Sequence, residues 1–150
     1  MSLKLGNIEN LCECSDLTTS LDEIKEVESY LNFSFPLELR KIFETCNGGK
    51  PIPNTISYKD QIFAINYFFS LTEIKNYKNL YDDESFPNGY QQLDLIPFAY
   101  DMGNGTFAIS NKPKDCGKVV FFYFEEKAVI YGEWDNFNEF LSSFIDKSQN

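Results

Sequence analysis

Residues 95–110 read LIPFAYDMGNGTFAIS, and this stretch predicts a β-hairpin around which the rest of the chain is organised. An apolar, strand-like run from Leu95 to Ala99 leads into residues 101–105, where aspartate, asparagine and two glycines provide turn chemistry. Residues 106–109 then resume the strand. Asp101 is expected to accept hydrogen bonds from amides of the turn. The glycines do not indicate a phosphate-binding loop, because a strand rather than a helix follows them.

The regions on either side of this hairpin predict an α+β fold. Apolar spacing and capping signals predict helices over residues 20–32, 36–47, 71–80 and 135–145. Further strands are predicted over residues 55–58, 61–69, 118–124 and 128–131. Ser20 and Ser70 each begin a Ser-x-x-Glu capping box, and Asp135 is the expected N-cap of the last helix. Since strands joined by short turns pair antiparallel, we expect one antiparallel sheet of about five or six strands, or one mixed at an edge, with about four helices packed on it.

The length and the cysteines of the chain indicate one domain that folds without stabilising cross-links or cofactors. A chain of 150 residues buries enough surface to fold alone, so residues 1–150 are expected to form a single domain with its core at about 20–145. Residues 1–18 have weak periodicity and predict a loose lead-in. Cys12 and Cys14 are too close for a zinc-binding pair, and the sequence contains no histidine. We therefore expect no metal, no cofactor and reduced thiols, while a structural or regulatory disulfide stays open.

The charge of the chain favours a basic protein partner. The formal net charge is −10, and residues 82–135 carry ten acids against four bases. Such a protein repels nucleic acid and anionic membranes, although a solvated acidic face can also serve solubility alone. No apolar run is long enough to span a bilayer, and no signal sequence is visible. The expected location is the cytoplasm.

Acidic and aromatic residues of the C-terminal half form the expected partner-binding face. Tyrosine suits interfaces because its ring contributes area and its hydroxyl a hydrogen bond, although a tyrosine capping the core has the same pattern. The expected partner-binding residues are Asp82, Asp83, Glu84, Tyr90, Tyr100, Asp101, Glu125 and Glu126. No catalytic residues are expected, because without histidine the serines and cysteines lack their commonest general base.

Four segments in order along the chain carry a family resemblance. They are the helix with Ile24, Val27, Glu28 and Leu31 followed by Phe35-Pro36 and Cys46-Asn47-Gly48-Gly49, the segment Phe69-Ser70-Leu71-Thr72-Glu73-Ile74, the hairpin from Ile96 to Gly105, and residues 134–141, WDNFNEFL. Together they resemble the SMI1/KNR4 family, also called the SUKH superfamily, over about residues 20–145.

The resemblance implies a class of function. Bacterial members look like immunity proteins, which bind and block a toxin delivered by a neighbouring cell, often a nuclease or a deaminase. Fungal relatives are linked to cell-wall glucan regulation as scaffolds. No catalytic residues are associated with the family. The resemblance thus implies a non-catalytic binding protein with a toxin domain as partner; the alternative is an intracellular scaffold or regulator of cell-wall synthesis. The acidic charge makes a basic toxin domain the expected partner, and we expect a monomer.

Overall fold

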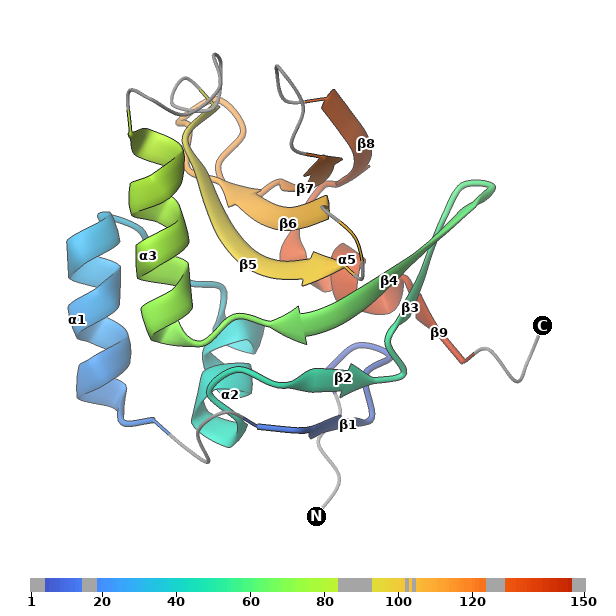
Figure 1. Cartoon of the computed structure of the whole chain (residues 1–150), viewed down its shortest axis with the longest axis horizontal. Helices are drawn as coiled ribbons and strands as arrows, with labels where there is room; N and C mark the ends of the chain where they lie inside the picture. Colours follow the sequence, from blue (N-terminus) through green and yellow to red (C-terminus); the bar gives the residue numbers. More distant parts are fainter. Residues whose placement is uncertain are drawn as a thin grey trace.

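The computed structural model describes residues 5–14, 19–83, 93–101, 103, 105–123 and 129–146, and in this part of the chain four helices accompany a large sheet and a small one (Figure 1). The helices are α1 (Leu21–Leu31), α2 (Leu37–Thr45), α3 (Leu71–Asp82) and α5 (Phe137–Ser142). The large sheet contains β3 (Thr55–Tyr58), β4 (Gln61–Phe68), β5 (Leu95–Asp101), β6 (Gly105–Ser110), β7 (Val119–Tyr123), β8 (Val129–Trp134) and β9 (Phe144–Ile145). The small sheet pairs β1 (Asn10–Cys12) with β2 (Lys50–Ile52). The predicted α+β class is confirmed.

The large sheet has the strand order β8-β7-β6-β5-β4-β3-β9, and its neighbours pair antiparallel, as predicted. The β5–β6 hairpin lies inside this sheet, between β4 and β7. Over the described residues the sheet has seven strands, more than the predicted five or six, because β9 adds to one edge beside β3.

The last predicted helix is too long. Helix α5 ends at Ser142, and Phe144 and Ile145 form β9, where they pair with Ile56 and Thr55. Phe144 and Ile145 continue the helical spacing of apolar residues, but pairing with β3 satisfies their backbone groups and buries Phe144. The helix also begins one residue later than predicted, because Asn136 rather than Asp135 is the N-cap. The Oδ1 atom of Asn136 accepts the N–H of Glu139 at 2.8 Å.

The start of the chain is not a loose lead-in where the structure describes it. Leu5, Ile8 and Leu11 are buried in the hydrophobic core, and Asn10–Cys12 pairs with β2. The side-chain amide of Asn7 donates to the carbonyl oxygens of Ser142, at 2.7 Å, and Phe144, at 3.0 Å. This segment therefore joins the two ends of the described chain.

The expectation of reduced thiols is wrong for two of the four cysteines. Cys14 and Cys46 form a disulfide with their Cα atoms 5.4 Å apart, whereas Cys12 and Cys116 are free. The bond ties the segment after β1 to the C-cap of α2.

Aromatic residues pack against both faces of the sheet. On one face, Tyr81 of α3 contacts Phe122 of β7, with ring centroids 6.1 Å apart. On the other face, Phe140 of α5 lies 5.5 Å from Phe107 of β6, which lies 4.4 Å from Phe121 of β7. The continuous apolar run of β7 is therefore buried on both faces, as its composition indicates.

Residues of the family motifs hold the helices in place. The carboxylate of Glu28 accepts the backbone N–H of Phe35 at 2.6 Å and pairs with Arg40 at 2.8 Å, which fixes α1 to the start of α2. The Oδ1 atom of Asn47 accepts the N–H of Leu71 at 2.9 Å, which positions the first turn of α3. Both predicted capping boxes, which begin at Ser20 and Ser70, are confirmed.

Candidate partner-binding site

The expected partner-binding residues that the structure describes fall into two separate groups. Asp82 and Asp83 lie at the C-terminal end of α3, beside the start of β5. Tyr100 and Asp101 lie at the other end of β5. Since a strand rises about 3.3 Å per residue, the length of β5 puts the groups roughly 20 Å apart. The remaining four expected residues, Glu84, Tyr90, Glu125 and Glu126, lie outside the described residues.

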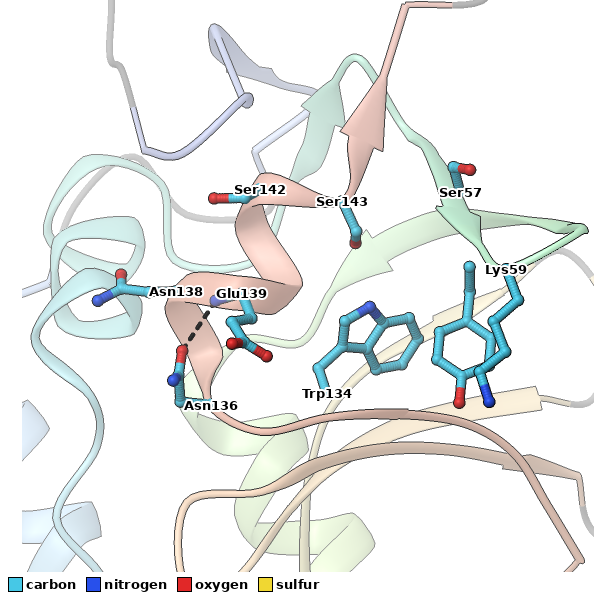
Figure 2. A pocket seen from close by; sticks show the side chains of 9 residues that line it. Ser57, Lys59, Trp134, Asn136, Asn138, Glu139, Ser142 and Ser143 are labelled. Atoms are coloured by element: carbon cyan, nitrogen blue, oxygen red, sulfur yellow. Dashed lines mark hydrogen bonds between the residues drawn. The ribbon is translucent and has the colours of Figure 1, made fainter.

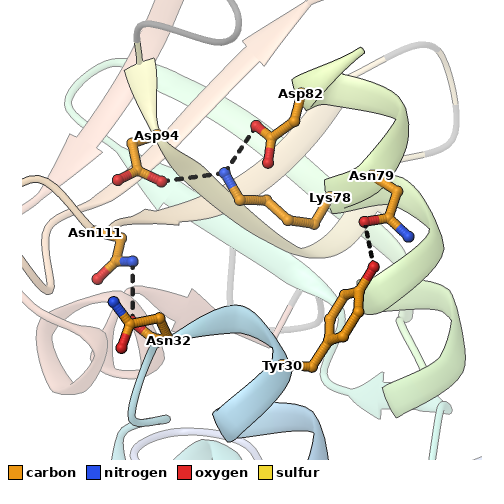
Figure 3. Close-up of polar contacts among 7 residues, drawn as sticks. All are labelled: Tyr30, Asn32, Lys78, Asn79, Asp82, Asp94 and Asn111. Atoms are coloured by element: carbon orange, nitrogen blue, oxygen red, sulfur yellow. Dashed lines mark hydrogen bonds and ion pairs between the residues drawn. The ribbon is translucent and has the colours of Figure 1, made fainter.

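Asp82 belongs to an ion-pair network at the end of α3 (Figure 3). Lys78 is only 8% exposed, and its Nζ atom contacts Oδ1 of Asp82 at 3.0 Å and Oδ1 of Asp94 at 3.1 Å. Beside this network the hydroxyl of Tyr30 in α1 donates to Asn79 of α3 at 2.8 Å. Lys78 thus neutralises part of the negative charge of Asp82 within the protein. A lysine at position 82 would instead be repelled by the buried ammonium group of Lys78.

Asp101 has the structural role expected from the turn sequence. Its Oδ1 atom accepts the backbone N–H groups of Gly103 and Gly105, each at 2.8 Å. The carboxylate also acts on Tyr123, whose pKa is raised first by burial and then by the charge of Asp101. Asp101 therefore stabilises the β5–β6 turn.

Tyr100 lines a hollow of about 290 Å³, which we call the Tyr67–Tyr100 pocket. The lining residues are Glu13, Gly48, Tyr67, Phe68, Glu73 and Tyr100. They come from the segment after β1, the segment between α2 and β2, strands β4 and β5, and the first turn of α3. Sequence reasoning identified only Tyr100, because the other residues are brought together by pairing between distant segments.

A hydrogen bond and ring contacts hold the walls of the Tyr67–Tyr100 pocket in place. The Tyr67 hydroxyl donates to Oε2 of Glu13 at 2.9 Å, and the rings of Tyr67 and Tyr100 lie 6.0 Å apart. Tyr100 also stacks on Phe69 at 5.3 Å, and Phe69 stacks on Tyr77 of α3 at 4.6 Å. The pocket walls are therefore continuous with the core.

The two glutamates act on the two phenols of this pocket. The pKa of Tyr67 is raised by the hydrogen bond to Glu13 and then by the charge of that carboxylate. The pKa of Tyr100 is raised by burial and then by the negative charge of Glu73. The pocket thus combines aromatic walls with a negative potential.

A Glu13→Gln variant is expected to lower the pKa of Tyr67 toward its ordinary value of about 10, because glutamine accepts the hydrogen bond without a charge. In the parent protein, Tyr67 keeps its proton at pH values where the unfolded chain loses it. Its contribution to stability is present below about pH 10 and is lost as the pH rises through the folded pKa. Ultraviolet titration of tyrosinate should show the shift. Asp60→Asn, at the β3–β4 turn, is the matched control and should leave the titration unchanged.

A second hollow, of about 560 Å³, lies between the β3–β4 hairpin and α5 (Figure 2). Its lining residues are Ser57, Tyr58, Lys59, Trp134, Asn136, Asn138, Glu139, Ser142 and Ser143. Trp134 is only 6% exposed and packs 5.1 Å from Phe140, so it offers little surface to a ligand. Among the described residues, no group of three or more histidine, cysteine, aspartate or glutamate side chains could hold a metal ion.

The antiparallel sheet, with α3 packed on one face and α5 on the other, defines an α+β protein that combines a strongly acidic composition with an aromatic, acidic pocket. The chain belongs to the SMI1/KNR4 family (SUKH-1), whose model matches residues 18–143. No curated protein matches the chain in sequence. None of the described helices has the length and apolar character needed to cross a membrane.

Proposed function

We propose that this chain is an immunity protein that binds a basic toxin domain, of nuclease or deaminase type, and blocks it without catalysing a reaction. The observation that carries the proposal is membership of the SMI1/KNR4 family, whose bacterial members look like immunity proteins. The net charge of −10 supports it. An enzyme acting on nucleic acid attracts phosphate with lysine and arginine, and an acidic protein is drawn to the same surface.

The surroundings of the acidic residues support a choice among them for steering. Asp82 faces Lys78, and Asp101 is held by the amides of its turn. Asp83 is exposed at the end of α3, and Glu84 follows it in the sequence. An interface of about 1,600 Å² in total would extend from this end of α3 to Tyr100.

Neutralisation is tested with the toxin domain encoded beside the gene for this chain. The two proteins are produced together in cells, and growth and co-purification are measured. We expect growth to be restored and the proteins to purify as a complex with about one copy of each. Cell death at matched expression, with no complex formed, would overturn the proposal and favour the scaffold role.

Charge steering predicts a specific kinetic change. Asp83→Lys with Glu84→Lys should slow association with the toxin domain by roughly tenfold at low salt, and the difference from the parent should shrink as salt screens the charges. Asp82 is left unchanged, because reversing it would oppose Lys78. Glu26→Lys with Glu44→Lys, on α1 and α2, is the control with the same change in net charge. If both pairs slow association equally, overall charge rather than this face steers binding.

A further inference from the structure

We propose that the Tyr67–Tyr100 pocket receives the guanidinium group of an arginine side chain on the basic partner. The partner's identity as a toxin rests on the proposed function, whereas the chemistry of the pocket does not. The pocket would provide a specific anchoring point in an interface for which composition indicates only an acidic character.

The shape and lining of the pocket suit a planar cation. Phe68 and the rings of Tyr67 and Tyr100 provide aromatic surface, and Glu13 and Glu73 supply carboxylates from separate segments of the chain. A cation over the face of a tyrosine ring is attracted by the π electrons, and arginine can stack on the ring as well. The planar guanidinium group of arginine carries five N–H donors, so it can donate to carboxylates on two sides at once. The compact ammonium group of lysine is less suited to span two separate carboxylates.

In the part of the chain that the structure describes, no lysine or arginine forms an ion pair with the two carboxylates of the pocket. The four ion pairs found there involve Glu28, Asp82, Asp94 and Glu133, and neither pocket glutamate takes part. Glu13 accepts the Tyr67 hydroxyl through Oε2, and Glu73 accepts the backbone N–H of Ser70 through Oε1 at 3.0 Å. Since a carboxylate offers about four acceptor positions, both groups keep capacity for an incoming donor.

The protein holds these groups in place before any partner binds. Glu13 is followed by Cys14, which the disulfide joins to Cys46. The capping box fixes Glu73 in the first turn of α3. Tyr100 is supported by Phe69, which stacks on Tyr77. Groups that are already ordered lose little conformational freedom on binding, so the pocket is suited to act as an anchor.

The probe for this site is acetyl-arginine amide, added to the full chain while backbone amide NMR shifts are followed. Acetyl-citrulline amide, which has the same shape without the charge, is the control ligand. We expect saturable shift changes at Gly48, Tyr67 and Tyr100 with the arginine compound, in the millimolar range typical of a single side chain. The citrulline compound should bind at least tenfold more weakly.

A variant pair tests the carboxylates without removing their structural hydrogen bonds. Glu13→Gln can still accept the Tyr67 hydroxyl, and Glu73→Gln can still complete the capping box. The double variant should bind acetyl-arginine amide at least tenfold more weakly than the parent. Asp60→Asn with Glu44→Gln changes the net charge equally and should retain parental binding.

Three results would overturn the arginine proposal. They are absence of shift changes in the pocket, equal binding of the citrulline compound, and parental binding by the Glu13→Gln, Glu73→Gln double variant. Should that double variant also bind and neutralise a toxin as well as the parent, the pocket is not the anchor and the proposed function still stands. Saturable arginine binding together with a failure to neutralise any neighbouring toxin would support the pocket and overturn the proposed function.

Discussion

Replacing Gly105 by alanine is expected to lower the free energy of unfolding by about 2–3 kcal/mol, because the added methyl group has no space. A Cβ atom at this position would overlap the ring of Phe121 and lie 3.0 Å from Oδ2 of Asp101. Phe121 cannot move aside easily, since it is fully buried and packs 4.4 Å from Phe107. For a domain of this size, thermal unfolding should occur roughly 5–10 °C lower.

Gly103→Ala is the matched control for this substitution. The nearest atom to a Cβ at position 103 is Oδ1 of Asp101, at an ordinary contact distance of 3.7 Å. We expect a loss of stability well below that of Gly105→Ala in the same urea or thermal unfolding experiment. Equal losses would show that the turn backbone, rather than the contact with Phe121, requires glycine.

The second large effect is expected for Glu28→Ala, which should cost about 2–3 kcal/mol of stability. The Glu28 side chain is 10% exposed, and its removal leaves the N–H of Phe35 without its acceptor. Arg40 loses both carboxylate oxygens, which its Nη2 atom contacts at 3.0 and 2.8 Å. Because the Arg40 side chain is 31% exposed, water replaces part of this interaction, and the loss is smaller than for a fully buried ion pair.

Glu26→Ala tests whether this loss is specific to the carboxylate at position 28. Glu26 is exposed on the same helix, and its removal should change stability by no more than about 0.5 kcal/mol. Both variants are compared with the parent by urea unfolding, with the slope of the transition as a check on the unfolded state. Similar effects of the two substitutions would indicate that removing any carboxylate from α1, rather than losing the contact with Phe35 and Arg40, is the cause.

The features predicted from sequence are those that depend on neighbouring residues. The capping boxes at Ser20 and Ser70 and the hairpin over residues 95–110 are local patterns, and the structure contains all three. Apart from the N-cap of α5, which is Asn136 instead of Asp135, the errors concern pairing at long range. Phe144 fits the helical stripe of α5, but its pairing with Ile56 places it in β9, and no local signal indicates that partner.

The candidate site was less predictable than the fold for the same reason. Tyr100 is a recognisable interface residue, whereas Glu13 and Tyr67 become neighbours only because β1 and β4 are both brought against β2. The family motifs contribute to both the framework and the pocket. Glu28 and Asp101 accept backbone N–H groups inside the fold, whereas Gly48, Glu73 and Tyr100, from three other parts of the motifs, line the pocket.

The contact between Asn7 and the end of α5 has a consequence for synthesis in the cell. Asn7 leaves the ribosome long before the carbonyl groups of Ser142 and Phe144 that accept its side-chain amide, which follow it by 135 and 137 residues. The outer edge of β3 likewise stays unpaired until β9 has been synthesised. The contacts of Asn7 and the outer edge of β3 are therefore completed only after residue 145 has left the ribosome, so this part of the fold forms late.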